Sequence, residues 1–112
     1  MDSETAIVRC LVKGEPWESN FTIKIYKDQT IEMLKQRIKQ AITTNAQYAS
    51  FKLYGVSLAK QDKTRLSEIY GQLGNQQHRM LDSMDTVEEA LPTRKEKHIH
   101  VIVELPGTLF SV

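Results

Sequence analysis

Residues 97–107 read KHIHVIVELPG, and this stretch decides the fold. Its side chains alternate between two sides of an extended chain: one set is Ile99, Val101, Val103 and Leu105, and the other is His98, His100, Ile102 and Glu104. A strand that is apolar on nearly both sides is typical of the middle of a sheet, where both faces are covered. Pro106-Gly107 supplies turn chemistry at its end. The sequence therefore predicts a central last strand, His98–Leu105.

Two further strands are predicted at the start of the chain. Ile7–Val12 is rich in β-branched residues, and Asn20–Lys27 alternates apolar and polar side chains. Gly14-Glu15-Pro16 lies between them and favours a turn, so the two strands should form a hairpin. A last strand in the middle of such a sheet commonly runs parallel to the first.

The pattern then changes to that of a helix, predicted from Thr30 to Thr43. Thr30 is a good N-cap residue. Apolar side chains recur at spacings of three and four, at Ile31, Leu34, Ile38 and Ile42. The cationic residues outside this stripe, which are expected to face solvent, are Lys35, Arg37 and Lys39.

The middle of the chain is harder to interpret. Residues 51–54 predict a third strand, broken at Gly55, with a short extension over residues 56–60. Residues 61–97 hold two short helical patterns, near 66–73 and 86–91, and then a charged connector, 93–97.

This order of elements predicts an α+β fold in which one long helix packs across a mixed sheet. The second short helix should be N-capped near Asp85 and stopped by Pro92. The predicted core comprises Ile7, Ile23, Ile25, Ile31, Leu34, Ile38, Leu53, Ile99, Val101 and Val103.

The composition narrows the classes of function. The 112 residues suit one domain, and 15 Lys and Arg against 14 Asp and Glu leave no basic surplus, so direct nucleic-acid binding is not expected. The sequence has no run of about 18 apolar residues and no visible secretory signal, so membrane insertion is not expected. Cys10 is the single cysteine, which excludes an intramolecular disulfide, and it should be half-buried in the first strand.

The sequence also lacks catalytic motifs. It has no Gly-rich phosphate loop, no Gly-x-Ser-x-Gly and no His-Glu-x-x-His, so we expect no enzyme activity, cofactor or small-molecule substrate. His98 and His100 lie on one side of a strand and could form a His-x-His metal clip, but zinc would need at least one more ligand. We expect no metal, and two histidines at the surface or in an interface.

Three stretches resemble the ubiquitin-like β-grasp fold. They are TIEMLKQRI at 30–38, similar to the start of the ubiquitin helix, FKLYGVSL at 51–58, similar to its third strand and turn, and HIHVIV at 98–103, similar to its last strand. The resemblance implies a β-grasp domain. Conjugation of the ubiquitin type is not expected, because the tail at 106–112 reads PGTLFSV and lacks a terminal Gly-Gly.

A second resemblance is more specific. Leu58-Ala59-Lys60 is similar to the end of the Leu-Phe-Leu-Ala-Lys motif in the N-terminal domains of Crinkler effectors, and residues 97–106 are similar to the family's closing His-Val-Leu-Val-Val-Val-Pro signature. The family-motif residues are therefore Leu58, Ala59, Lys60, His98, His100, Val101 and Pro106. Val56 and Ser57 stand where the motif has Leu and Phe, a departure that is more similar to fungal than to oomycete members.

This resemblance implies a function for the domain. Residues 1–107 would be a ubiquitin-like N-terminal domain, and residues 108–112 the start of a linker or tail. The domain would be non-catalytic and would serve delivery, dimerisation or partner docking for a C-terminal toxic domain. The effector would be secreted and act in a host cell, commonly in the nucleus. The alternative is a stand-alone intracellular ubiquitin-like adaptor, similar to Ras-association modules.

The predicted partner surface is the sheet face that the long helix leaves uncovered. Its partner would be another protein or a second copy of the chain. The interface residues expected on this face are Tyr26, Lys52, Tyr54, His100 and Ile102, with Trp17 near the tip of the first hairpin. Because His100 would lie in the contact, pairing of two copies should weaken below a pH of about 6.5.

Overall fold

The computed structural model describes residues 4–42, 50–74 and 78–105. Its elements, with η marking a 3-10 helix, are β1 (Thr5–Val12), η1 (Trp17–Ser19), β2 (Phe21–Tyr26), α1 (Ile31–Ile42), β3 (Lys52–Leu58), η3 (Lys60–Arg65), α2 (Leu66–Tyr70), α3 (Val87–Ala90) and β4 (Ile99–Glu104). The predicted helix end at Thr43, the motif residue Pro106 and the predicted tail at 108–112 lie outside the described residues.

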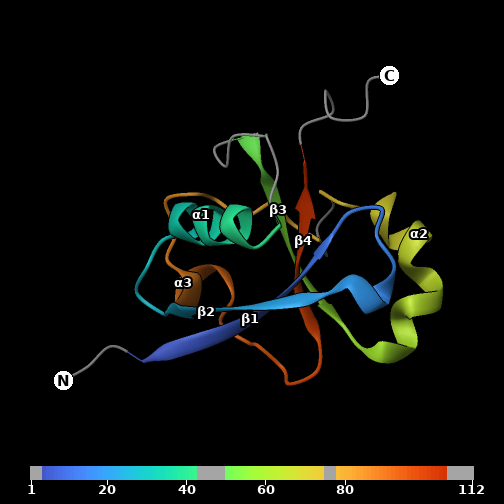
Figure 1. Cartoon of the computed structure of the whole chain (residues 1–112), viewed down its shortest axis with the longest axis horizontal. Helices are drawn as coiled ribbons and strands as arrows, with labels where there is room; N and C mark the ends of the chain where they lie inside the picture. Colours follow the sequence, from blue (N-terminus) through green and yellow to red (C-terminus); the bar gives the residue numbers. More distant parts are fainter. Residues whose placement is uncertain (1–3, 43–49, 75–77, 106–112) are drawn as a thin grey trace.

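The four strands form one mixed sheet in the order β2-β1-β4-β3 (Figure 1). β1 and β2 form an antiparallel hairpin, and β4 runs parallel to β1 and antiparallel to β3. The predicted hairpin and the predicted central last strand, parallel to the first, are therefore confirmed. β4 is buried from Ile99 to Val103, because it has a strand on each side and cover on both faces.

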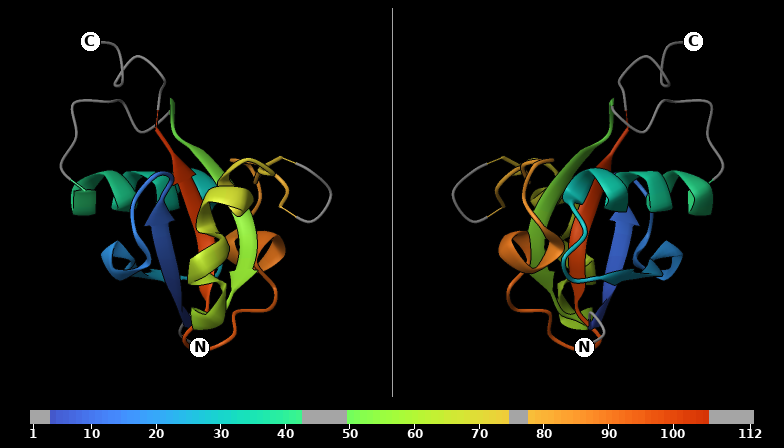
Figure 2. Two further views of the ribbon diagram at one scale, coloured as in Figure 1. Left: turned by 90° about the vertical axis from the view of Figure 1, so that its right-hand side faces the viewer. Right: turned by 90° about the vertical axis from the view of Figure 1, so that its left-hand side faces the viewer.

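Helix α1 lies across one face of the sheet, as Figures 1 and 2 show. Thr30 caps it, with its hydroxyl Oγ1 accepting a hydrogen bond from the Met33 N–H at 3.3 Å. The predicted apolar stripe packs on the sheet, and Ile31, Leu34 and Ile38 have no exposed surface. The main core cluster joins this stripe to alternate residues of the strands, among them Val8, Cys10, Ile23, Ile25, Leu53, Val101 and Val103.

The opposite face of the sheet is also covered. The segment formed by η3 and α2 lies against it, so the sheet is between α1 and α2 in Figure 2. Leu66 and Ile69 of α2 are buried there in a second apolar cluster. That cluster also contains Leu11, Tyr54, Leu58, Ile99 and Ile102. The fold is therefore an α+β arrangement with three layers at its centre.

Three details of the predicted burial are wrong. Cys10 is fully buried rather than half-buried, because it faces α1 in the core. Ile7 is 58% exposed, because Ala6, Val8 and Cys10 are the β1 residues that face α1. The core side of the first strand is therefore one residue away from the predicted core position at Ile7. Lys35 is buried rather than solvated, because its ammonium reaches the Ser83 hydroxyl at 2.8 Å beneath the 82–85 segment. Desolvation lowers the pKa of Lys35.

Candidate functional site: a basic cleft beside β1

The structure separates the residues that were predicted to form a partner surface. Tyr26 is 46% exposed and Lys52 is also exposed. Three others are buried inside the chain, namely Tyr54 (7% exposed), His100 (5%) and Ile102 (0%). Trp17 is half-buried against the second apolar cluster. The expectation that this face is open is wrong over β3 and β4, because η3 and α2 cover Tyr54 and Ile102 there. His100 is buried between Arg9 and Lys95, and the β2 end of the face remains exposed at Tyr26. A role in partner binding for the exposed Tyr26 and Lys52 stays a prediction.

The family-motif residues in β3 and η3 have clear structural positions. Leu58 ends β3 and is buried in the second apolar cluster. Ala59 forms the turn into η3: its N–H donates to the Asp62 carboxylate at 2.9 Å, and its carbonyl accepts from the Asp62 N–H at 2.8 Å. Lys60 is exposed on η3. The motif therefore marks the point where the chain leaves β3 and begins η3, which is the first part of the segment that covers the second face of the sheet.

The closing motif places a histidine at a junction of three segments. The Nδ1 of His100 accepts the backbone N–H of Arg9 at 3.0 Å, and its Nε2 lies 2.8 Å from the carbonyl of Lys95. A backbone N–H can only donate and a carbonyl can only accept, so His100 is neutral with its proton on Nε2. Both ring nitrogens are thus occupied by backbone groups, and neither is available to a metal. Val101 is fully buried beside it in the core.

A cleft of about 510 Å³ lies between the first half of β1 and the connector that precedes β4. One wall is formed by residues 5–7 with Arg9, and the other by residues 94–97 with His100. Lys27 also lines it. The lining therefore carries five cationic side chains, Arg9, Lys27, Arg94, Lys95 and Lys97, against one acidic side chain, Glu96. The cleft is the candidate functional site.

Helix α3 fixes the position of the connector. The carbonyls of Gln29 and Lys27 accept the N–H groups of Val87 at 2.8 Å and Glu88 at 3.1 Å, which ties the helix to the end of β2. Thr86 and Glu89 close its N-terminus reciprocally, each side chain accepting the other residue's N–H. The connector that leaves α3 must therefore pass beside β1.

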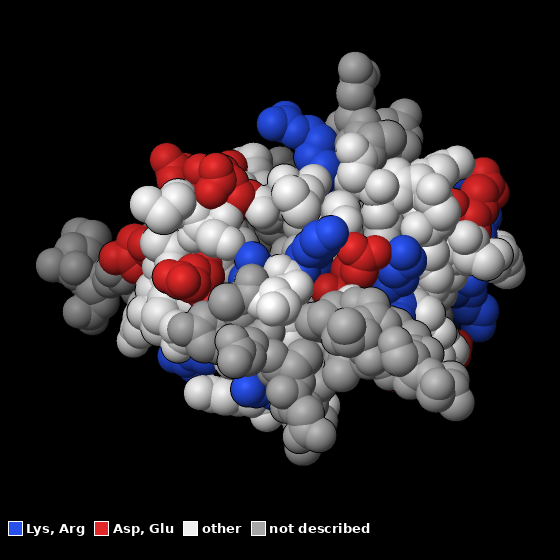
Figure 3. Space-filling view, turned by 90° about the horizontal axis from the view of Figure 1, so that it is seen from above, with Lys and Arg blue, Asp and Glu red and all other residues white. Residues whose placement is uncertain are grey.

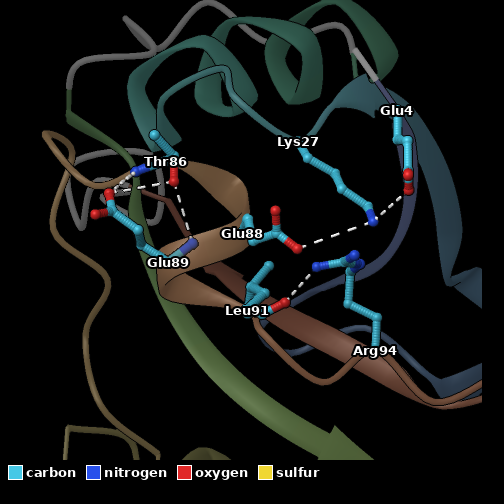
Figure 4. A network of polar contacts seen from close by, with 7 residues as sticks. All are labelled: Glu4, Lys27, Thr86, Glu88, Glu89, Leu91 and Arg94. Carbon is cyan, nitrogen blue, oxygen red and sulfur yellow. Dashed lines mark hydrogen bonds and ion pairs between the residues drawn. The ribbon is translucent and has the colours of Figure 1, made fainter. Parts of the chain in front are cut away.

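Contacts with neighbouring residues hold two of the cleft's cations, Lys27 and Arg94, in place (Figure 4). The Lys27 ammonium reaches the Glu4 carboxylate at 2.8 Å and the Glu88 carboxylate at 3.9 Å. The Arg94 guanidinium donates to the carbonyl of Leu91, at the end of α3. Arg9 on the opposite wall donates from Nη1 to the Asn20 side-chain oxygen at 2.7 Å. Contacts within the chain therefore hold all three of these cationic side chains.

Lys95 and Lys97 differ from those three cations. Neither forms an ion pair with any of the residues that the structure describes, and both are exposed. Lys97 has a left-handed backbone with φ of +63°, which turns the chain from the connector into β4. The His98 ring lies just beyond, with Nδ1 3.0 Å from the Glu96 carbonyl.

The charge of the cleft contrasts with that of another part of the surface. On the face seen in Figure 3, acidic and basic side chains are interspersed. In the cleft, positive charge dominates, and it affects His100. Desolvation lowers the pKa of His100, and the positive charges of Arg9, Arg94 and His98 lower it further, while the hydrogen bond to Lys95 acts in the opposite direction. A negatively charged group that binds here would be attracted by these cations. Water would screen the attraction less than at an open surface, because the cleft is partly buried.

Sequence reasoning missed this cleft. The run at 93–97 is recognisable only as a charged connector, and Arg9 and Lys27 belong to other elements. Two signals could have indicated it: a basic cluster directly before the central strand, and a first strand long enough to extend past that strand. The pairing of distant segments that creates the cleft follows from topology rather than from any local pattern.

Three further properties of the described residues concern metal ligands, thiol reactivity and membrane spans. No group of three or more His, Cys, Asp or Glu that could hold a metal ion occurs among them. Burial raises the pKa of the Cys10 thiol far above its usual range, so this thiol is a poor nucleophile. No helix in the described part of the chain is long and apolar enough to cross a membrane. What the site can do is bind negative charge.

Comparison with known proteins places the chain in a family. No curated protein sequence matches it. A family model described as the Crinkler effector protein N-terminal domain matches residues 8–104, which include β2, β3, β4, both covers and β1 from Val8 onward, but not residues 5–7 of the cleft. The motif at Leu58–Lys60 and the closing motif from His98 to Glu104 lie within that match, while Pro106 lies beyond its end. The chain therefore belongs to the Crinkler effector family, through its N-terminal domain.

Proposed function

We propose that the chain is the non-catalytic N-terminal domain of a secreted Crinkler-type effector, and that it docks an attached C-terminal toxic domain onto a host protein. The observation that carries this proposal is the family match over residues 8–104. The basic cleft adds a surface on which docking can occur. Delivery into the host cell and accumulation in its nucleus would follow from that docking.

The sheet supports the finer assignment to the ubiquitin-like β-grasp. Its order is β2-β1-β4-β3 with β1 and β4 parallel at the centre, and one long helix connects the hairpin to β3 across one face. Folds of this kind host many unrelated functions, so the assignment supports an adaptor role by analogy only.

The proposed delivery and docking function is tested with a reporter. A fluorescent protein fused after Val112 is expressed with the chain in a producing cell, and the same reporter without the chain is the control. We expect reporter fluorescence in the nuclei of host cells only when the chain is present. Equal fluorescence with and without the chain would contradict the proposed function. A second control, Leu34→Asp, disrupts the core and should abolish delivery.

A further inference from the structure

The cleft contains an unpaired strand edge. β1 runs from Thr5 to Val12, but it pairs with β4 only at Cys10, Leu11 and Val12. Residues 5–9 therefore extend past the start of β4, over roughly 13 Å at about 3.3 Å per residue. On their other side these residues pair with β2. The β1 edge that faces the connector, at residues 5–9, therefore has no strand paired with it among the residues that the structure describes.

The direction of the free backbone groups follows from the hydrogen bonds. The Glu4 carbonyl accepts the Lys27 N–H at 2.9 Å, which marks Glu4 as a hydrogen-bonded position of the antiparallel pair. Because these positions recur at every second residue, the even-numbered residues of β1 direct their backbone N–H and C=O groups toward β2. The Arg9 N–H instead donates to His100, on the opposite side. Thr5 and Ile7 share the parity of Arg9, so their N–H and carbonyl groups are directed into the cleft. Neither residue has a backbone hydrogen bond to the connector among the residues that the structure describes.

The side chains around this edge favour a particular ligand. The connector wall brings Arg94, Lys95 and Lys97 opposite the edge, and its one carboxylate is that of Glu96. Ile7 is 58% exposed at the same place, on the sheet face away from α1. A ligand that fits would offer a backbone to pair with Ile7, an apolar side chain to cover it, and carboxylates to meet the connector.

We propose that the cleft binds an extended acidic segment of a protein partner, which adds to the free edge of β1 as a short extra strand. Main-chain hydrogen bonds from Thr5 and Ile7 give affinity, and the cations of the connector select acidic side chains. The His100 bridge between β1 and the connector keeps the two walls in place. This inference rests on the proposed docking function and names the chemistry of the docked segment.

A peptide titration tests the proposal directly. The probe is a fluorescein-labelled peptide of alternating Asp and Val, eight residues long, and fluorescence anisotropy reports its binding to the whole chain. We expect saturable binding that weakens with added salt, because the cations in the cleft are partly exposed. A peptide of alternating Lys and Val should not bind. An Asp-Val peptide that is methylated on the backbone nitrogen of alternate residues lacks the hydrogen-bond donors along one of its edges. Its affinity should be lower by about tenfold or more.

A pair of charge variants locates the binding. Lys95→Ala with Lys97→Asn removes two cations and keeps a residue that tolerates the left-handed backbone at 97. We expect the affinity of this variant for the Asp-Val peptide to be lower by about tenfold or more, which is the size expected for the loss of two charge-assisted contacts. The matched control, Lys52→Ala with Lys60→Asn, removes two exposed cations outside the cleft and should keep most of the affinity. Equal losses in the two variants would overturn the site.

Amide hydrogen exchange distinguishes strand addition from simple charge attraction. Saturating peptide should slow exchange at Ile7 about tenfold or more, because a new hydrogen bond forms at its N–H. Peptide binding without protection of Ile7 would overturn strand addition. Inorganic phosphate or single-stranded DNA that displaces the peptide at equal charge concentration would overturn the preference for a protein segment. Reporter delivery that succeeds in the Lys95 and Lys97 variant would separate the two proposals, because the delivery function would then hold without this cleft.

Discussion

At the scale of single residues, His100 shows how a motif residue can be structural. Sequence reasoning placed it on an open face, where it would respond to pH in contact with a partner. The structure instead buries it between Arg9 and the connector. There its ring accepts the Arg9 N–H, at a point where β1 is not paired with β4. The charged form would lose the acceptor for the Arg9 N–H, so protonation works against the folded state.

Stability should therefore depend on pH through His100. Its pKa is lowered in the folded chain, chiefly by desolvation, with Arg9, Arg94 and His98 acting in the same direction. Below about pH 6.5 the unfolded chain then binds more protons than the folded one, so the free energy of unfolding falls as the pH falls from there. Thermal unfolding between pH 7.5 and 5.5 should show this loss in the natural chain.

The comparison that isolates the residue is between two single variants. His100→Gln should largely remove the loss of stability between pH 7.5 and 5.5. His98→Gln should keep most of it, because the largest cause of the lowered pKa of His100 is the burial of its own ring. The lowered pKa values of Glu4 and Glu104 act at a more acidic pH, toward and below 4.5, and do not interfere. An identical pH dependence in both variants would show that another group is responsible.

Lys97 offers a second test at this scale. Its φ of +63° is left-handed, a conformation that costs a residue with a Cβ roughly 1–2 kcal/mol. Lys97→Gly should therefore leave the free energy of unfolding unchanged or raise it by up to about 1 kcal/mol. Lys97→Val should lower it by about 1–2 kcal/mol, because a β-branched residue tolerates this region least. Denaturant unfolding measures both changes.

The control is Lys95→Gly, where φ is not positive and only the entropic cost of glycine applies. A gain of equal size at Lys95 would contradict the strain at Lys97.

At the scale of secondary-structure elements, the sequence predicted what regular periodicity describes. The hairpin, α1 with its Thr30 cap, and the central β4 all have clear alternation or a clear helical stripe, and all three are confirmed. The short helix predicted near 66–73 is present as α2, but its packing on the sheet was not predicted, because η3 has no helical period and α2 has only five residues. The shift in β1 has a similar cause. Ala6, Ile7 and Val8 are all apolar, so local pattern does not decide which of them faces the core.

The importance of the second cover can be measured by truncation. Ile69 of α2 is 2% exposed, in contact with the sheet, and Ile69→Ala should lower the free energy of unfolding by about 2–5 kcal/mol. Ile7→Ala is the matched control, because the same atoms are removed from a side chain that is 58% exposed, and its effect should be within about 0.5 kcal/mol. Urea unfolding gives both values. A small effect at Ile69 would mean that α2 only rests loosely on the sheet.

At the scale of the whole molecule, the candidate site depends on topology. Arg9, Lys27 and the connector at 94–97 are far apart in the sequence, and the parallel placement of β4 beside a longer β1 brings them together. The basic cluster before β4 and the length of β1 are only weak signals for such a meeting, which is why the fold could be predicted in outline and the cleft was missed. The predicted partner face failed for the same reason, since its cover comes from a segment with weak local signals.

Self-association of two copies stays a prediction, but its surface must change. The face carrying Tyr54, His100 and Ile102 is inside the protomer. The 79–81 segment lies along β3, whose Gly55 N–H donates to the Arg79 carbonyl at 2.9 Å. Apart from the short free edge of β1 in the cleft, the sheet edge left for pairing in the described part of the chain is the outer edge of β2, at Phe21–Tyr26.

The pH dependence first predicted for pairing should therefore be absent. A contact along β2 places no histidine between the copies, because both histidines near the sheet lie at the start of β4. We expect the sedimentation coefficient at each protein concentration to be the same at pH 7.5 and at pH 5.5, with circular dichroism confirming that the chain is folded at both. The lowered pKa of His100 supports this expectation, since the residue resists protonation within its own protomer. A dimer at neutral pH that dissociates at pH 5.5 while still folded would contradict it, and would mean that η3 and α2 leave the sheet to expose the pairing face.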